Sequence, residues 1–235
     1  MSYKKLLDNE IEEKIHEEIV NIIKPYCKGT NKVLDLGCGD DWIANKIDYK
    51  TLHLVDRELE PINTTGILRG NIISYKMDIK QFLSFAEEMD AKYDIIFLLG
   101  VIEHLNHKEK GNLLGSVKGL LNDGGIFVMG YPNARSLNRV LGVEMDLINT
   151  PYVLTDGDKQ IGHQSMYDSR AINHFRFYLQ LKTERIEGIM FKPLPNFLML
   201  KYFRNDLDKF VEIGKEVGWE YCGYILAIYR KENES

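Results

Sequence analysis

The fold is decided by the stretch Val33-Leu34-Asp35-Leu36-Gly37-Cys38-Gly39-Asp40-Asp41. It begins as an apolar run with a β-branched residue, which predicts a buried strand, and it breaks at two glycines. The following segment, Trp42–Ile47, has the apolar spacing of a helix and predicts a helix start. A strand, a glycine turn and a helix start direct backbone N–H groups at whatever lies above the strand end. Since glycine lets the backbone approach a ligand closely, we expect a nucleoside cofactor here.

The details of the turn narrow the choice of cofactor. The dinucleotide fingerprint G-x-G-x-x-G requires glycine at position 42, where Trp42 stands, and this disfavours a nicotinamide-dependent dehydrogenase. The phosphate-binding pattern G-x-x-x-x-G-K-[ST] is also absent. Instead, Asp35 precedes the first glycine in the order D-x-G-x-G. A carboxylate there repels pyrophosphate and favours a ligand that carries a cationic amino-acid group.

This stretch resembles the first motif of class I S-adenosylmethionine (SAM)-dependent methyltransferases, which usually reads V-L-D-L-G-C-G-x-G. The usual third glycine is an aspartate here, and aspartate adopts a positive φ more readily than most residues, so the turn can survive. The departure leaves open a module that binds SAM without transferring its methyl group. In this loop the resemblance implies six cofactor-binding residues, Asp35, Gly37, Cys38, Gly39, Asp41 and Trp42.

Size and composition restrict the class of protein. A chain of 235 residues predicts a single domain over residues 1–235, and 44% hydrophobic with 28% charged residues predicts a soluble protein with a sizeable core. A net charge of −5 and no basic run argue against a nucleic-acid partner. Three widely spaced cysteines fit a reducing compartment, and no metal-ligand spacing is evident, so we predict no metal site. Without a leader-like or membrane-spanning apolar segment, we expect a cytoplasmic protein.

The first part of the chain predicts a helix and further strands. Residues 9–24, within an N-terminal segment 1–30, form an amphipathic helix expected to pack on the sheet or cover the cofactor site. Strands are predicted at 51–56, 72–77 and 93–100. Together with the strand at Val33 they make the parallel half of a doubly wound sheet, whose ligands bind at the carboxyl ends of the strands.

Several side chains at these strand ends have predicted roles toward the cofactor. Asp56 ends the second strand, where a carboxylate binds both ribose hydroxyls, and the resemblance implies the same role with Arg57 beside it. The resemblance also implies that Asp78 accepts from the adenine amino group, while the backbone of Ile79 contacts the ring. Alternatively, Asp78 caps the helix that begins near residue 80. Leu99, at the end of the fourth strand, completes the predicted cofactor set.

The segment Val101-Ile102-Glu103-His104-Leu105 resembles the V-L-E-H segment of small-molecule methyltransferases related to the ubiquinone-biosynthesis enzymes. The resemblance places Glu103 and His104 beside the sulfonium methyl group. His104 is a candidate base, or alternatively a structural residue bonded to a neighbouring loop. A helix at 108–121, a turn at 122–125 and a fifth strand at 126–130 follow. The strand ends in a P-N pair typical of the same group, and Tyr131 and Asn133 are expected to place the acceptor, unless Asn133 caps the next element.

Residues 134–167 lack clean periodicity, and in this fold an insertion after the fifth strand forms a lid over the active site. The segment Gly162–Tyr167 closes the lid with the pattern G-H-x-x-x-Y. His163 is a candidate base because its pKa lies near working pH, with a structural role as the alternative, and Tyr167 is a candidate acceptor contact. A helix at 168–180, a strand at 182–191, a helix at 203–217 and a last strand at 223–230 complete an α/β, Rossmann-like, doubly wound seven-stranded sheet, mostly parallel with an antiparallel C-terminal strand.

The resemblance implies SAM as cofactor, S-adenosylhomocysteine (SAH) as product and a small-molecule acceptor. Enzymes that methylate amino groups of nucleic acids carry [N/D]-P-P-[Y/F] after the fourth strand, where this chain has residues 99–102 in the form L-G-V-I. This difference argues against a nucleic-acid acceptor. The lid and the G-H-x-x-x-Y segment resemble those of methyltransferases that modify surface polysaccharides or natural products. The resemblance implies O-methylation of a sugar, a nucleotide-linked sugar or a phosphorylated intermediate in surface-polysaccharide or secondary-metabolite biosynthesis. N-methylation of a small amine is the alternative activity.

Overall fold

The computed structural model describes residues 9–59 and 70–233, and it contains a seven-stranded sheet in the order β3-β2-β1-β4-β5-β7-β6. Strands β1 to β5 pair in parallel, whereas β7 runs antiparallel to both β5 and β6. This arrangement confirms the predicted fold class. The strands are β1 (Lys32–Leu36), β2 (Thr51–Asp56), β3 (Asn71–Lys76), β4 (Tyr93–Leu99), β5 (Leu121–Pro132), β6 (Lys182–Phe191) and β7 (Cys222–Arg230).

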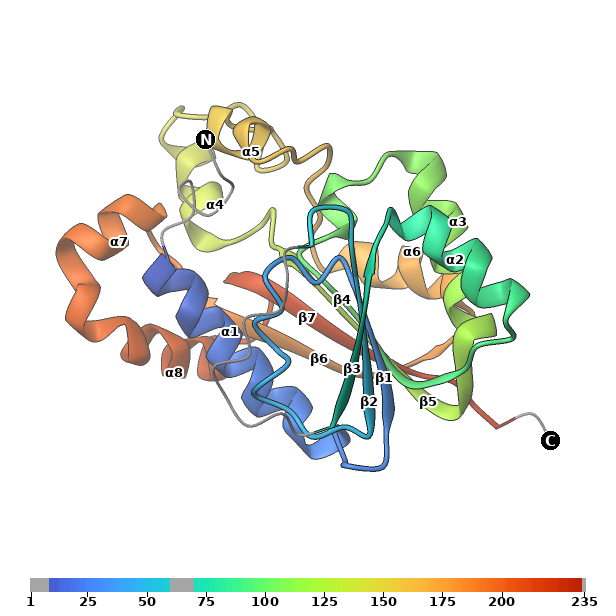
Figure 1. The fold of residues 1–235 in the computed structure, drawn as a ribbon. Coiled ribbons are helices and arrows are strands. Elements are labelled where there is room, and N and C mark those ends of the chain that lie inside the picture. The colour runs from blue at the N-terminus through green and yellow to red at the C-terminus, as the bar shows by residue number, and fades with distance from the viewer. Residues whose placement is uncertain (1–8, 60–69, 234–235) are drawn as a thin grey trace.

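Helices cover both faces of the sheet (Figure 1). One face carries α1 (Asn9–Ile23), α7 (Asn196–Phe203) and α8 (Leu207–Val217), and the other carries α2 (Ile79–Glu88), α3 (His107–Leu120) and α6 (Arg170–Leu179). Successive strand residues alternate between the two cores, so Val33 packs with α1 while Leu34 packs with α2 and α3. Burial on both faces is why the central strands read as continuous apolar runs. Within the described ranges, no helix has the length and apolar character needed to cross a membrane.

The predicted helix at Trp42–Ile47 is wrong, because these residues form consecutive turns. The amide of Ala44 donates to the carbonyl of Asp41, and the amide of Lys46 donates to that of Ile43, which is three-residue rather than four-residue spacing. The apolar side chains that suggested a helix, Ile43, Ala44 and Ile47, are all fully or almost fully buried against the sheet. Turns with this spacing are wound more tightly than an α-helix and extend further along their axis per residue. The short connection therefore still covers the strand.

Near the C-terminus the helix boundaries differ from the prediction. The helix expected at 203–217 begins at Leu207, after a short 3₁₀ turn over Arg204–Asp206. Helix α7 was missed because Pro193 and Pro195 suggested a loop, although Pro195 stands directly before the first helical residue. The predicted turn at 122–125 lies inside β5, where the register with β4 shifts and Gly124 has a φ of 72°.

The insertion after β5 contains two short helices, α4 (Leu137–Glu144) and α5 (Asp156–Gln160), which lie above the sheet (Figure 1). Its two ends are joined, since the amide of Ala134 donates to the carbonyl of Tyr167 at 2.7 Å. Inside the insertion, Arg139 donates to the carbonyls of Pro151 and Val153 and contacts Asp158 at 3.2 Å. The segment is therefore a braced structure rather than an open loop.

The end of β5 is fixed by the side chain of Asn133, which is 1% exposed. Its Nδ2 donates to the carbonyls of Glu220 at 2.8 Å and Cys222 at 2.9 Å, and its Oδ1 accepts from the amide of Arg135 at 2.9 Å. One amide group thus connects the beginning of the lid to the beginning of β7.

Replacing Asn133 by alanine leaves buried backbone carbonyls without donors. We expect the free energy of unfolding to fall by about 2–3 kcal/mol in urea titrations monitored by circular dichroism. The matched control is Asn173→Ala on the exposed side of α6, which is expected to change stability by less than about 0.5 kcal/mol. Equal effects of the two substitutions would contradict this assignment.

Candidate active site

The loop after β1 adopts left-handed backbone conformations at Gly37, Gly39 and Asp41, with φ of 74°, 56° and 55°. The amides of Gly37 and Cys38 both point to the carbonyl of Val55, at 2.7 and 3.2 Å, and so join the end of β1 to β2. The turn therefore forms with aspartate in the place of the usual third glycine, as predicted. No helix N-terminus directly follows the loop, because residues 41–46 form turns, so no helix end points at a ligand there.

The two glycines differ in what a side chain would meet. A Cβ at Gly37 would lie 2.5 Å from Cγ2 of Val101, so this glycine permits close packing against the segment after β4. A Cβ at Gly39 would meet no protein atom of the described chain within 4 Å. The space beside Gly39 is open, which is what a ligand in contact with the backbone requires.

Two acidic side chains flank this loop at the carboxyl ends of β1 and β2. Asp56 accepts from the amide of Gly39 at 3.1 Å through Oδ2 and from the amide of Glu58 at 2.8 Å through Oδ1. Each carboxylate oxygen has two lone pairs, so both can still accept a ribose hydroxyl. Asp35 is 4% exposed, and burial, with the charges of Asp56 and Asp41, raises its pKa to about 7.

The other predicted cofactor residues lie along the same edge of the sheet. Asp78 caps α2, with its Oδ1 accepting from the amide of Lys80 at 2.8 Å, which confirms the capping alternative and leaves the adenine role a prediction. Ile79 is the first residue of α2 and packs against the hydrophobic core between α2 and the sheet. Arg57 is exposed, and Leu99 is half-buried at the end of β4.

Helix α1 packs on the sheet and also contacts the loop after β1 (residues 37–42), which we call the cofactor loop. The sequence predicted that this helix packs on the sheet or covers the cofactor site. The imidazole of His16 stacks on the indole of Trp42 with ring centroids 3.8 Å apart and an interplanar angle of 2°. Burial, and then the charge of Lys46, lowers the pKa of His16 to about 4, so a neutral imidazole makes this contact. Sequence reasoning did not single out His16.

Beyond β4, Gly100 turns the chain with a φ of 67° into the 3₁₀ turn η3 (Ile102–His104). The segment that closes the lid packs on this turn. The amide of Gln164 donates to the carbonyl of Glu103 at 2.7 Å, and its Nε2 donates to the carbonyl of His104 at 2.8 Å. These bonds bring together two predicted catalytic segments that are far apart in the sequence.

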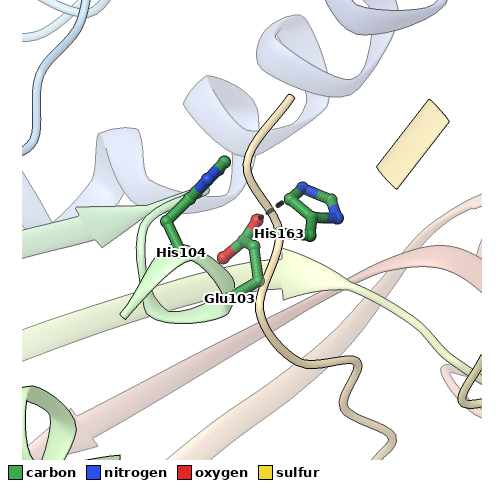
Figure 2. A group of neighbouring side chains, drawn as sticks. All are labelled: Glu103, His104 and His163. Atoms are coloured by element: carbon green, nitrogen blue, oxygen red, sulfur yellow. Dashed lines mark ion pairs between the residues drawn. The ribbon is translucent and has the colours of Figure 1, made fainter. Parts of the chain in front are cut away.

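Glu103, His104 and His163 form one cluster, which we call the lid triad (Figure 2). The Nε2 of His163 lies 4.0 Å from the Oε1 of Glu103, and the two imidazole centroids are 4.8 Å apart. Glu103 is 2% exposed and His163 is 8% exposed, whereas His104 is half-buried. The Oε2 of Glu103 has no hydrogen-bond partner in the described part of the chain.

The charges around the lid triad follow from this burial. Burial raises the pKa of Glu103 to about 7, and burial together with His163 lowers the pKa of His104 to about 4. The charge of Arg57 also lowers the pKa of His104, which places the end of β2 across from η3. A neutral imidazole and a carboxyl group near its titration point therefore face the strand ends at neutral pH.

Asp158 in α5 fixes the position of His163. Its backbone carbonyl accepts from the amide of His163 at 2.9 Å, and its Oδ1 lies 3.5 Å from the Nδ1 of that ring. Burial alone raises the pKa of Asp158, but contacts with His163 and Thr155 outweigh it and hold the pKa well below its usual range. Sequence reasoning missed Asp158, although Thr155 three residues earlier is a helix-capping signal.

Tyr131, Asn133 and Tyr167, which were predicted to contact the acceptor, make most of their contacts with other residues of the protein. Tyr131 is fully buried, donates to the carbonyl of Asp168 at 3.2 Å and packs against Tyr167 and Phe175. Asn133 bonds to backbone groups of Glu220 and Arg135, and it does not cap α4, whose N-cap residue is Ser136. Tyr167 is half-buried and contacts Phe175 edge-on. These contacts fit a structural role, and their contact with an acceptor remains a prediction.

Comparison with known proteins agrees with this geometry. A family profile described as a methyltransferase domain matches residues 3–175. No match is found among curated proteins. The chain belongs to this family of class I SAM-dependent methyltransferases, and its cofactor is SAM.

Solved structures with low sequence identity share the fold. A SAM-dependent methyltransferase from Archaeoglobus fulgidus is 19% identical with a TM-score of 0.55, and the match covers 94% of this chain and 97% of that one. The 1,6-didemethyltoxoflavin-N1-methyltransferase of Burkholderia thailandensis is 12% identical with a TM-score of 0.61, covering 99% and 84%. The N-methyltransferase NodS of Bradyrhizobium japonicum is 14% identical with a TM-score of 0.55, covering 96% and 99%.

Gly39→Ala fills the open space beside the cofactor loop. We expect SAH binding, measured by isothermal titration calorimetry, to weaken about tenfold or more, because the methyl group occupies the ligand's volume. The control is Gly124→Ala. Gly124 also has a positive φ, 72°, and a Cβ there would meet only the Oδ1 of Asn233, at an ordinary contact distance of 3.6 Å. This variant carries a comparable backbone strain and should leave SAH affinity unchanged. An equal loss of SAH affinity in both variants would show that Gly39→Ala acts only through backbone strain in the folded protein.

Asp35 makes stability depend on pH in a predictable direction. Its pKa is raised from 3.8 to about 7 on folding, so the native state holds a proton that the unfolded chain releases. The free energy of unfolding therefore falls as the pH rises from about 4 to 7. Without cofactor, Asp35→Asn should gain on the order of 2 kcal/mol relative to the parent between pH 5 and pH 8, as measured by urea unfolding. Identical pH profiles would contradict the buried carboxyl assignment.

Proposed function

We propose that this methyltransferase transfers the methyl group of SAM to an oxygen atom of a small polar acceptor. The acceptor classes that fit are a sugar, a nucleotide-linked sugar or a phosphorylated intermediate of surface-polysaccharide or secondary-metabolite biosynthesis. The observation that carries the proposal is the lid triad, a buried carboxyl group and two imidazoles at the strand ends.

The cofactor would lie across the ends of β1, β2 and β4. Asp35 and the loop at Gly39 would take its amino-acid part, Asp56 its ribose and Asp78 its adenine, so that the methyl group points to η3. In support, Asp56 is tied to Gly39 by a hydrogen bond of 3.1 Å, and the space at Gly39 is open. In this proposed arrangement the lid triad would lie at the reacting end of the cofactor.

An oxygen acceptor explains the chemistry of the triad better than an amine does. The leaving group of a sulfonium is already activated, so the protein mainly aligns the two reactants and excludes water. A hydroxyl must also lose its proton, whereas a neutral amine already offers its lone pair. The Glu103 and His163 pair can receive that proton, and Asp158 orients the imidazole behind it.

A second candidate is N-methylation of a small amine. It is favoured by two solved structures of similar fold, which are N-methyltransferases. The net charge of −5 supports a small-molecule rather than a nucleic-acid acceptor in both cases. A module without catalysis is less consistent with a loop that keeps its turn and with a charged group held under the lid. The proposed acceptors are cytoplasmic metabolites, and we expect the enzyme to act there.

Acceptor panels test the proposal directly. The protein is incubated with methyl-tritiated SAM and with nucleotide sugars, free sugars, sugar phosphates and small amines in separate reactions. Mass spectrometry of a labelled product then locates the methyl group. Label on a hydroxyl oxygen supports the proposal, and label on nitrogen supports the second candidate. SAH binding without label in any metabolite fraction would indicate the non-catalytic module.

Removing either member of the buried pair should slow the chemical step. For an oxygen acceptor, we expect Glu103→Gln and His163→Gln each to lower the single-turnover rate about 100-fold or more at saturating SAM. The matched control is His174→Gln on the exposed side of α6, which should keep the parental rate. SAH affinity should change less than threefold in all three variants. Full rates in both triad variants would show that the pair takes no part in the reaction.

A further inference from the structure

The lid triad offers the donor set that divalent transition metals prefer in proteins. It supplies one carboxylate and two imidazoles, and one ligand atom from each side chain lies within 4.8 Å of the others. Imidazole nitrogen suits Zn²⁺ and Fe²⁺, while Mg²⁺ and Ca²⁺ prefer oxygen ligands alone. The sequence suggested no metal site because Glu103 and His104 meet His163 only after the lid has closed on η3.

A second observation points to a missing cation. The carboxylate of Glu103 is 2% exposed, and its Oε2 has no hydrogen-bond partner among the described residues. The nearby ammonium of Lys110 instead donates to the Oγ of Ser165 at 2.9 Å and lies over the ring of Tyr167. A buried carboxylate oxygen without a partner is costly, and a bound cation would remove that cost.

Both imidazoles also have a polar neighbour outside the triad, as metal-binding histidines usually do. The ring of His104 hydrogen-bonds to the backbone of Gly162. The Nδ1 of His163 lies 3.5 Å from the Oδ1 of Asp158 and makes no hydrogen bond within the described residues, while its Nε2 is the atom on the Glu103 side.

We propose that Glu103, His104 and His163 bind one divalent first-row transition-metal ion of the Zn²⁺, Fe²⁺ or Mn²⁺ class. Bonds of about 2.1 Å in a tetrahedral site would require ligand separations of roughly 3.4 Å, so the present cluster must contract by about 1 Å or slightly more. His104 is half-buried, whereas Glu103 and His163 are buried, so His104 is the member of the triad that solvent reaches. The role of the ion rests on the proposed function, whereas its binding does not. Glu103 and His163 would then hold the ion instead of taking the proton. The ion would lower the pKa of the bound acceptor hydroxyl, whose proton would leave to water.

The test uses tag-free protein treated with chelator and then titrated with Co²⁺, without SAM or acceptor. Co²⁺ bound by nitrogen and oxygen ligands in a low coordination number gives visible absorption bands that the aqueous ion lacks. We expect bands that saturate at one equivalent and disappear when Zn²⁺ is added. In a parallel thermal melt, Zn²⁺ should raise the Tm of the parent, because it binds the folded state.

Three variants identify the ligands. His104→Gln and His163→Gln should each weaken Co²⁺ binding about tenfold or more, while His174→Gln should bind as the parent does. No saturable bands in the parent, or bands that persist unchanged in both triad variants, would overturn the proposal. SAH titrations of the same samples separate this outcome from a failure of the proposed function, because they report the cofactor site alone.

Discussion

The arrangement of the site depends on the backbone hydrogen bonds between η3 and the end of the lid. The carbonyl of Glu103 accepts from the amides of both Gln164 and Ser165. A buried carbonyl needs such partners, so the lid cannot open at this point without leaving polar groups unsatisfied. The same backbone bonds therefore fix both the position of Glu103 and the position of the end of the lid. Two further contacts fix the rest of the lid. The amide of Ala134 donates to the carbonyl of Tyr167, and Arg139 bonds inside the lid.

The acidic strand ends are the second feature on which the chemistry rests. Asp35, Asp41 and Asp56 lie close enough for their charges to affect one another, and they do so beside an open glycine loop. Such a concentration of negative charge is unfavourable in the empty protein and favourable once a cationic ligand is present. SAM carries a sulfonium and an ammonium group, whereas SAH has lost the sulfonium charge. If SAM lies at this loop as proposed above, the negative charge would favour SAM over SAH.

Much of this architecture could be predicted from the sequence, and the predictions that are wrong or missing have identifiable physical reasons. The strands and their acidic ends follow from apolar runs that end in aspartate, as at Asp56, because local pattern and tertiary burial agree there. The helix expected at Trp42–Ile47 fails because burial requires only that Ile43 and Ile47 face the sheet, and turns satisfy this as well as a helix does. Asp158 and the lid triad depend on contacts between distant segments, which no local pattern encodes.

The stack of His16 on Trp42 has a spectroscopic consequence. The chain has two tryptophans, and one of them lies in the cofactor loop, face to face with an imidazole from α1. The emission of this indole therefore depends on the protonation of His16 and on any displacement of α1 from the loop. The protein thus contains an intrinsic fluorophore at the contact between its N-terminal helix and the loop after β1, and a change in that contact is observable in solution without any label.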